Sequence, residues 1–381
     1  MNKKIGLVVM FDISSAGGAP KVLVDFISAL NKLDREVYLL TPFKLDYKKI
    51  ESLFGKIKVK KIYYPGKIKS FVCKGNFLPR RFMKKEFLEM AKEVDLIIDI
   101  DGGIVHKYLP KNFDKKYIIW RFSCIGLKRP WVKNSFSRNT KEFIKILLGS
   151  KNCIPSKNHK VYVVDNWTKE ELKLWGINCQ DIFLYPEIKI DTFLDEKRKK
   201  KKQVSVFGRI TPNKSIEDSI RIFAIGTKNF PEYNLVIFGG GTADTKTYTE
   251  YLNKVIHKLG ISDRVKIIES PLFEEVKRLL LESSVLIDSQ KKVSMTLTSV
   301  EALATGSIIL VQKESGAYLE VLDKGKYGYG FNDVQEGAEK LKEIISKIEE
   351  GKLNPNKFSK RAEFFSEKNF IKRLKKILEE N

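Results

Sequence analysis

One stretch, Phe207-Gly208-Arg209-Ile210-Thr211-Pro212-Asn213-Lys214, places a glycine, an arginine and a lysine between a predicted strand and a predicted helix. The strand is expected over 204–207, and the helix follows with apolar residues at helical spacing. Gly208 allows a sharp turn, and a helix start adds free N–H groups and a positive dipole end. Arg209 can bind two phosphate oxygens and Lys214 adds a mobile charge, so the pattern indicates a diphosphate site. The alternative is an ordinary turn with solvated basic residues.

The rest of the C-terminal half alternates strands and helices. Strands are predicted over 234–238, 265–268, 285–288 and 308–311, and helices over 245–259 and 273–283. This order predicts a parallel sheet with helices on both faces, whose ligands bind beyond the carboxyl ends of the strands. Arg209, Lys214, the turn at Gly239 and Asp288 all fall at such ends.

Five motifs along the chain match, in order, those of one enzyme family. They are a first glycine loop at 16–21, G-R-x-x-x-x-K at 208–214, G-x-G at 239–241, E-A-x-A-x-G at 301–306 and a weaker G-A-x-x-E at 316–320. With these motifs the chain resembles the retaining nucleotide-sugar glycosyltransferases of the GT-B fold, in the large family four (glycosyl transferases group 1). The resemblance covers nearly the whole chain.

The resemblance implies an α/β protein with two Rossmann-like domains that face each other across a cleft. We expect an N-terminal acceptor-binding domain over 1–190, a basic linker over 191–202, a nucleotide-sugar domain over 203–357 and C-terminal helices over 358–381 that pack back on the N-terminal domain. A chain of 381 residues, 43% of them hydrophobic, is long enough for two cores.

The resemblance also implies roles for residues of the C-terminal half. Arg209 and Lys214 would act in catalysis by neutralising the donor diphosphate, whose second phosphate leaves with the nucleotide when the sugar is transferred. The residues expected to bind the donor nucleotide are Gly208, Gly239, Gly241, Thr296, Leu297, Thr298 and Glu301. Among them, Glu301 would accept hydrogen bonds from the ribose hydroxyls, and backbone N–H groups at 296–298 would bind phosphate oxygens. No metal and no cofactor besides the nucleotide sugar is expected, because fixed cations replace a metal.

The donor sugar and the acceptor are assigned less specifically. The candidates are Gly17, Gly18, Asp101, His106, Arg121 and Gly316, with a surface or packing role as the alternative for His106. The family usually pairs Glu301 with an acidic residue eight positions upstream, where this chain has Val293, and Met295-Thr296 replaces a nearby Phe-Gly step. Either another polar group therefore contacts the sugar, or the donor site is altered.

The net charge of +24 allows nucleic acid, an anionic membrane or a polyanionic substrate as a partner. No nucleic-acid-binding motif is visible, so no nucleic acid is expected. Residues 79–85 interleave basic and apolar side chains, and 143–148 form an apolar cluster. These segments either lie on anionic headgroups, which suits a lipid-linked acceptor, or pack inward. The basic run 197–202 indicates a solvated linker or, alternatively, a phosphate-binding patch.

The predicted function is metal-independent transfer of a sugar, with retention, from a nucleoside-diphosphate sugar to a glycan or lipid-linked acceptor. The alternatives are a catalytically impaired GT-B protein that binds a nucleotide or partner and, less favoured, a nucleic-acid-binding protein. No stretch is apolar enough to cross a bilayer and no signal peptide is evident, so we expect a cytoplasmic enzyme, with a peripheral position at the cytoplasmic membrane face left open. The four cysteines lack metal or redox spacing, which favours free thiols.

Overall fold

The chain forms two compact units, each built on its own six-stranded sheet. The computed structural model describes residues 3–15, 17–66, 83–100, 116–121, 159–174, 176–193, 199–241, 245–353 and 355–381. Unit 1 comprises Met1–Pro186 and Phe370–Asn381, and unit 2 comprises Glu187–Asn369. All neighbouring strands in both sheets run parallel, which confirms the predicted α/β class.

The sheet of unit 1 has the strand order β3-β2-β1-β4-β5-β6. Its strands are β1 (Lys4–Val8), β2 (Glu36–Leu40), β3 (Lys61–Tyr63), β4 (Leu96–Ile100), β5 (Lys116–Arg121) and β6 (Lys160–Val163). The helices that accompany it are α1 (Gly18–Lys32), α2 (Tyr47–Phe54), α4 (Lys84–Glu93) and α6 (Asn166–Lys173). All five residues of β4 are buried, as expected for a central parallel strand covered on both faces.

The C-terminal helix α13 (Glu367–Glu379) ends in unit 1, so the chain crosses back as the resemblance implies. The Phe370 ring lies 6.1 Å from the Phe26 ring of α1. Past the end of the helix, Lys160 Nζ donates a hydrogen bond of 2.9 Å to the Glu380 carbonyl. The preceding helix α12 (Pro355–Ala362) belongs to unit 2, so the part of the expected region 358–381 that joins unit 1 begins at Phe370.

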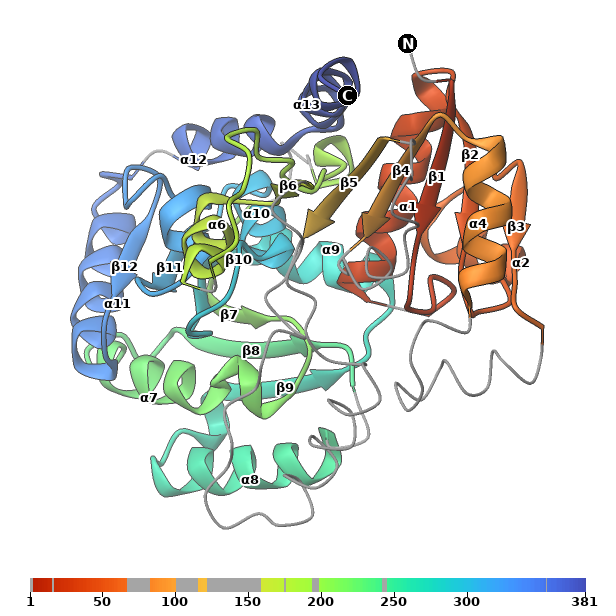
Figure 1. The fold of residues 1–381 in the computed structure, drawn as a ribbon. Coiled ribbons are helices and arrows are strands. Elements are labelled where there is room, and N and C mark those ends of the chain that lie inside the picture. The colour runs from red at the N-terminus through yellow and green to blue at the C-terminus, as the bar shows by residue number, and fades with distance from the viewer. Residues whose placement is uncertain are drawn as a thin grey trace. The chain divides into compact units, whose positions relative to one another are not determined.

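The sheet of unit 2 has the strand order β12-β11-β10-β7-β8-β9 (Figure 1). Its strands are β7 (Lys201–Phe207), β8 (Asn234–Gly239), β9 (Val265–Glu269), β10 (Ser283–Asp288), β11 (Ile308–Gln312) and β12 (Tyr329–Phe331). Its helices, besides α12, are α7 (Ile216–Gly226), α8 (Thr245–Lys258), α9 (Phe273–Glu282), α10 (Leu297–Ala304) and α11 (Val334–Glu349). In the part of the chain that is described, no helix is both long and apolar enough to cross a membrane.

The register of this sheet brings the candidate site together. Strand β7 lies between β8 and β10, and Phe207 at its end is paired with Phe238 of β8. The carboxyl ends of the three strands therefore share one edge, where Gly208, Gly239 and Asp288 follow or end them. That edge is where parallel sheets commonly bind ligands.

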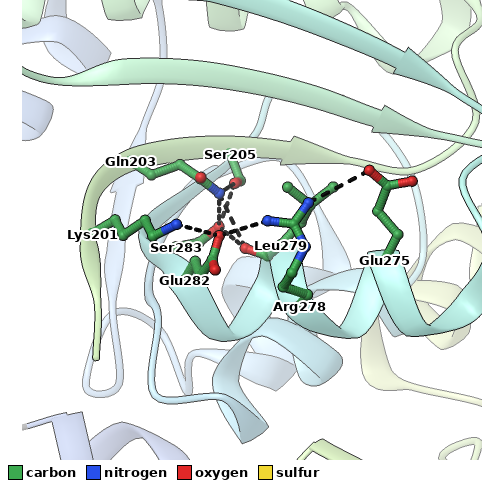
Figure 2. A network of polar contacts seen from close by, with 8 residues as sticks. All are labelled: Lys201, Gln203, Ser205, Glu275, Arg278, Leu279, Glu282 and Ser283. Atoms are coloured by element: carbon green, nitrogen blue, oxygen red, sulfur yellow. Dashed lines mark hydrogen bonds and ion pairs between the residues drawn. The ribbon is translucent and has the colours of Figure 1, made fainter. Parts of the chain in front are cut away.

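The amino ends of the same strands correct one expectation about the linker. Lys201 and Lys202, which were placed in a solvated basic run, belong to β7 and form ion pairs. Figure 2 shows Lys201 beside Glu282, the last residue of α9, with 3.1 Å between Nζ and a carboxylate oxygen. The run is therefore neither fully solvated nor wholly linker.

Candidate functional site

Two glycine turns at the ends of β7 and β8 are in direct backbone contact. Gly208 and Gly239 have φ values of 145° and 146°, which favour glycine strongly. Gly208 N donates to the Phe238 carbonyl at 3.1 Å, and Ile210 N donates to the Gly240 carbonyl at 3.0 Å. A Cβ atom on Gly239 would lie 1.9 Å from the Gly208 carbonyl oxygen, so no larger residue fits there without movement of the backbone.

Hydrogen bonds from neighbouring segments fix the second turn. Ser270 N donates to the Gly239 carbonyl at 2.8 Å, and the Ser270 hydroxyl accepts from Gly241 N at 3.3 Å. At the start of α8, the Thr245 hydroxyl donates to the Ile210 carbonyl at 3.0 Å. The predicted residues Gly208, Gly239 and Gly241 thus form one platform.

The two predicted cations lie at this platform. The Lys214 side chain folds back over Gly208, so that a Cβ atom there would meet Lys214 Cε at 3.3 Å and Nζ at 3.5 Å. Arg209 is exposed, and its Cγ atom lies 4.0 Å from the position of a Cβ on Gly240. Neither cation forms an ion pair with an acidic residue in the described part of the chain. Both charges are therefore available to an anionic ligand.

The first amide of α7 is not free for a ligand, although the sequence predicted free N–H groups at this helix start. A short 3-10 turn at Pro212–Lys214 precedes the helix, and Ser215 between them is left-handed, with a φ of 49°. The first helical amide, Ile216 N, donates to the Tyr248 hydroxyl at 3.2 Å, and that hydroxyl donates to the Glu217 carboxylate. Burial, together with Glu217, raises the pKa of Tyr248. This amide is thus satisfied inside the protein.

A buried carboxylate, Asp288, lies at the same site as the two cations. It lies at the end of β10 with 7% of its surface exposed, in a small recess that Gly208, Arg209 and Lys214 also line. Its Oδ1 accepts from Gln290 N at 3.1 Å, and its Oδ2 accepts from the Thr296 hydroxyl at 3.0 Å. The sequence placed Asp288 at this edge without a role. The only signal was a carboxylate at the end of a strand that is otherwise apolar or small.

Thr296 is the residue immediately before α10, and its hydroxyl does not cap that helix. The hydroxyl instead contacts Asp288 and, at 2.8 Å, the Ser299 hydroxyl. The N–H groups of the first turn, which includes Leu297 and Thr298, are thus not capped by this side chain. Glu301 follows one turn later and is partly exposed. This arrangement suits the predicted phosphate and ribose contacts.

The position of the missing acidic residue is now defined by backbone contacts. The Val293 carbonyl accepts from Gly316 N at 2.7 Å, and Lys292 N donates to the Glu314 carbonyl at 3.0 Å. The loop before α10 and the loop after β11 are therefore joined. Gly316, predicted on the sugar side, lies beside the position where the family has an acid.

The other predicted residues belong to unit 1. Gly17 and Gly18 are exposed at the start of α1, where Gly17 has a φ of 151°. Arg121, at the end of β5, is buried with 1% exposure. Asp101 and His106 lie outside the described residues, so their roles stay predictions.

The described residues include one cysteine, Cys179, and no cluster of metal-ligating side chains. Cys179 is not in a disulfide, and burial raises the pKa of its thiol to about 11. Cys73, Cys124, Cys153 and the segment 143–148 lie outside the described residues, as does 79–82 of the basic segment. Among the residues that are described, no three His, Cys, Asp or Glu side chains are grouped to hold a metal ion. The expectation of a metal-free enzyme stays a prediction.

Comparison with known sequences identifies the C-terminal half. The sequence profile of the family described as glycosyl transferases group 1 matches residues 189–364. Over 214 residues the chain is 29% identical to the human GDP-Man:Man(3)GlcNAc(2)-PP-Dol alpha-1,2-mannosyltransferase. This match covers 52% of the chain but only 43% of that relative.

Comparison with solved structures covers the whole chain. A glycosyltransferase from Rickettsia africae ESF-5 has a TM-score of 0.72 at 15% identity, over 99% of this chain and 98% of the other. The Anabaena protein Alr3699/HepE, solved in complex with UDP, has a TM-score of 0.70 at 17% identity, over 100% of both chains. The whole chain therefore has the GT-B fold, as predicted. Residues 189–364 thus match the glycosyl transferases group 1, and the whole chain shares the fold of solved glycosyltransferases.

Proposed function

We propose that this protein is a glycosyltransferase that moves a sugar from a nucleoside-diphosphate donor to a lipid-linked or free glycan, with retention and without a metal ion. One observation carries the proposal. Arg209 and Lys214 meet at the Gly208 and Gly239 turns with no acidic partner among the described residues. Cations without an acidic partner at a glycine turn are suited to a diphosphate.

The chemistry follows from where negative charge develops. When the bond between the sugar and the diphosphate breaks, charge builds up on the departing phosphate oxygen. Cations that are already held in place stabilise this charge more than the ground state, which lowers the barrier. Arg209 and Lys214 serve this role, while Glu301 holds the ribose hydroxyls and the α10 amides bind phosphate oxygens.

The donor base is left open by the relatives. The Anabaena structure contains UDP, whereas the human relative is named for GDP-mannose. The sugar site here lacks the acidic residue, because position 293 is valine and its carbonyl already accepts from Gly316 N. A sugar bound there is recognised by other groups.

A lipid-linked acceptor is supported by the human relative, whose name describes a dolichol-linked glycan. Together with the net charge of +24, this favours work at an anionic membrane surface on the cytoplasmic side. Binding to vesicles should then require anionic lipid and weaken as salt rises. Equal binding to neutral and anionic vesicles would favour a soluble acceptor.

A calorimetric screen tests the donor assignment before any acceptor is known. UDP, GDP and ADP, each alone and as sugar conjugates, are titrated into the parent protein and Glu301→Gln. We expect one base to be preferred and Glu301→Gln to weaken the bare nucleoside diphosphate, because the variant loses a charged acceptor. If Glu301→Gln binds it as tightly as the parent, the ribose role is wrong.

A second variant tests the altered sugar site. Val293→Glu restores a carboxylate at the family's position. It should leave nucleoside-diphosphate affinity nearly unchanged while changing which sugars on that nucleotide are hydrolysed or transferred. A parent protein that binds the nucleotide but never transfers or hydrolyses any sugar conjugate would favour the catalytically impaired alternative.

A further inference from the structure

The loop that connects β10 to α10, residues 289–296, is anchored at both of its ends by one carboxylate. Asp288 accepts from Gln290 N with Oδ1 and from the Thr296 hydroxyl with Oδ2, at 3.1 and 3.0 Å. With 7% of its surface exposed, Asp288 is withdrawn from most solvent. Both of its oxygens therefore serve the loop.

Further contacts hold the middle of the same loop. The Ser289 and Ser219 hydroxyls are 2.7 Å apart, which links the loop to α7. Lys292 is left-handed, with a φ of 50°, and its amide is bound by the Glu314 carbonyl. The Val293 carbonyl accepts a hydrogen bond from Gly316 N. The loop is thus held in one conformation where the family has a Phe-Gly step.

A negative charge beside a proposed phosphate site is unfavourable, so the presence of Asp288 there needs an explanation. Asp288 lines the same recess as Arg209 and Lys214, so its charge opposes the binding of a phosphate there. Its benefit lies in the Thr296 hydroxyl, which donates to Asp288 and forms no capping hydrogen bond with the backbone of α10. Thr296 thus leaves the first-turn amides uncapped, and the loop before them is held in place.

We propose that Asp288 is a positioning residue: through the Thr296 hydroxyl, its carboxylate fixes the loop 289–296 and sets the first turn of α10 against the anion site. This inference rests on the proposed function for its effect on the donor. The tether itself depends only on the contacts of Asp288 and Thr296.

Four variants separate the tether from the charge. Asp288→Asn keeps an acceptor for Gln290 N and offers a donor to the Thr296 oxygen, so the shape remains while the charge is lost. Asp288→Ala removes both contacts, and Thr296→Val removes only the hydroxyl at nearly constant volume. Thr296→Ser restores the hydroxyl. Thr305→Val makes the same substitution as Thr296→Val at the other end of α10, where the hydroxyl donates to the Ala302 carbonyl at 2.8 Å.

Affinity for UDP and GDP is measured by calorimetry, and amide hydrogen exchange at 297–299 is measured without ligand. We expect Asp288→Ala and Thr296→Val to weaken binding of the preferred nucleotide about tenfold and to speed exchange of these amides. Thr296→Ser should recover most of the loss, Asp288→Asn should lose far less than Asp288→Ala, and Thr305→Val should bind as the parent does.

Two results would overturn the inference. One is normal amide exchange in Thr296→Val, which would show that no tether exists whatever the donor. The other is an equal loss in Asp288→Asn and Asp288→Ala, which would show that the charge matters rather than the tether. Failure of the proposed function is distinct, because then the parent binds neither UDP nor GDP while the exchange measurement still reports on the tether.

Discussion

Among the described residues, the basic side chains of the candidate site are unpaired at one edge of the unit 2 sheet, and those of β7 are ion-paired at the other. At the carboxyl edge, Arg209 and Lys214 have no acidic partner among the described residues. At the amino edge, Lys202 Nζ lies 3.0 Å from a carboxylate oxygen of Glu232 and 2.9 Å from one of Glu349. Charge that the protein neutralises itself supports the fold, whereas charge left open at a glycine turn is suited to a ligand.

The amino edge also contains a buried polar network that needs no ligand (Figure 2). Three oxygens lie within hydrogen-bonding distance of Gln203 Nε2: the Ser205 hydroxyl at 3.1 Å, the Leu279 carbonyl at 3.1 Å and the Ser283 hydroxyl at 2.9 Å. Glu282 is contacted by Lys201 and, at 3.0 Å, by Arg278. The drawn polar groups bond one another, as buried polar groups in stable folds usually do.

The largest expected effect distinguishes the two glycine turns. Gly239→Ala and Gly208→Ala impose similar backbone strain, because the φ values differ by one degree. The new Cβ would meet a backbone oxygen at 1.9 Å in Gly239→Ala but only the flexible tip of Lys214 at 3.3 Å in Gly208→Ala. We expect Gly239→Ala to lower the free energy of unfolding by about 3 kcal/mol or more, and Gly208→Ala by roughly 1 to 2 kcal/mol. Denaturant titration checks both, and equal losses would contradict the close contact of the turns.

A pH effect is expected at the amino edge, where Lys200 Nζ donates to the Ser307 hydroxyl at 3.1 Å. Burial lowers the pKa of Lys200 from 10.5 to about 7. Between these values the unfolded chain binds more protons than the folded one, so this residue makes stability rise with pH above about 7. We expect the free energy of unfolding to rise by about 2 kcal/mol from pH 7 to 9, relative to Lys200→Met. Parallel pH profiles of the two proteins would show that the ammonium is not desolvated.

A smaller effect is expected for Glu282→Gln. The Glu282 side chain is nearly buried, but those of Lys201 and Arg278 are 60% and 41% exposed and can return to water. We therefore expect a loss of only about 1 kcal/mol in the free energy of unfolding, with nucleoside-diphosphate affinity unchanged. Lys201→Met is the matched control and should lose less. Weaker nucleotide binding in Glu282→Gln would mean that the two edges are coupled.

The sequence predicted those parts of the molecule that depend on local pattern. The β7 strand, the Gly208 turn and the alternation of strands and helices follow from apolar runs, glycine and spacing. The same patterns placed Arg209, Lys214 and the Gly239 turn at one sheet edge, as the structure shows.

Other features depend on residues far apart in the chain. Lys202 looked like part of a solvated run, because Glu232 and Glu349 reach it only in the folded sheet. Asp288 and Thr296 are close in sequence, but their bond requires the conformation of the intervening loop, including the left-handed Lys292. Neither contact has a signature in composition or periodicity.

The most direct test compares the unpaired cations at the carboxyl edge of the unit 2 sheet with a paired cation at its amino edge, and removes one basic side chain at a time. UDP and GDP are titrated into Arg209→Ala, Lys214→Ala and the charge-matched control Lys202→Ala, with unfolding followed on the same samples. Each of the first two should weaken binding of the preferred nucleotide about tenfold to a hundredfold, from a lost contact worth roughly 1.5 to 3 kcal/mol, with little change in unfolding. Lys202→Ala should change affinity by less than about twofold. Unchanged affinity in both Arg209→Ala and Lys214→Ala, or an equal loss in Lys202→Ala, would contradict a diphosphate site at the Gly208 turn.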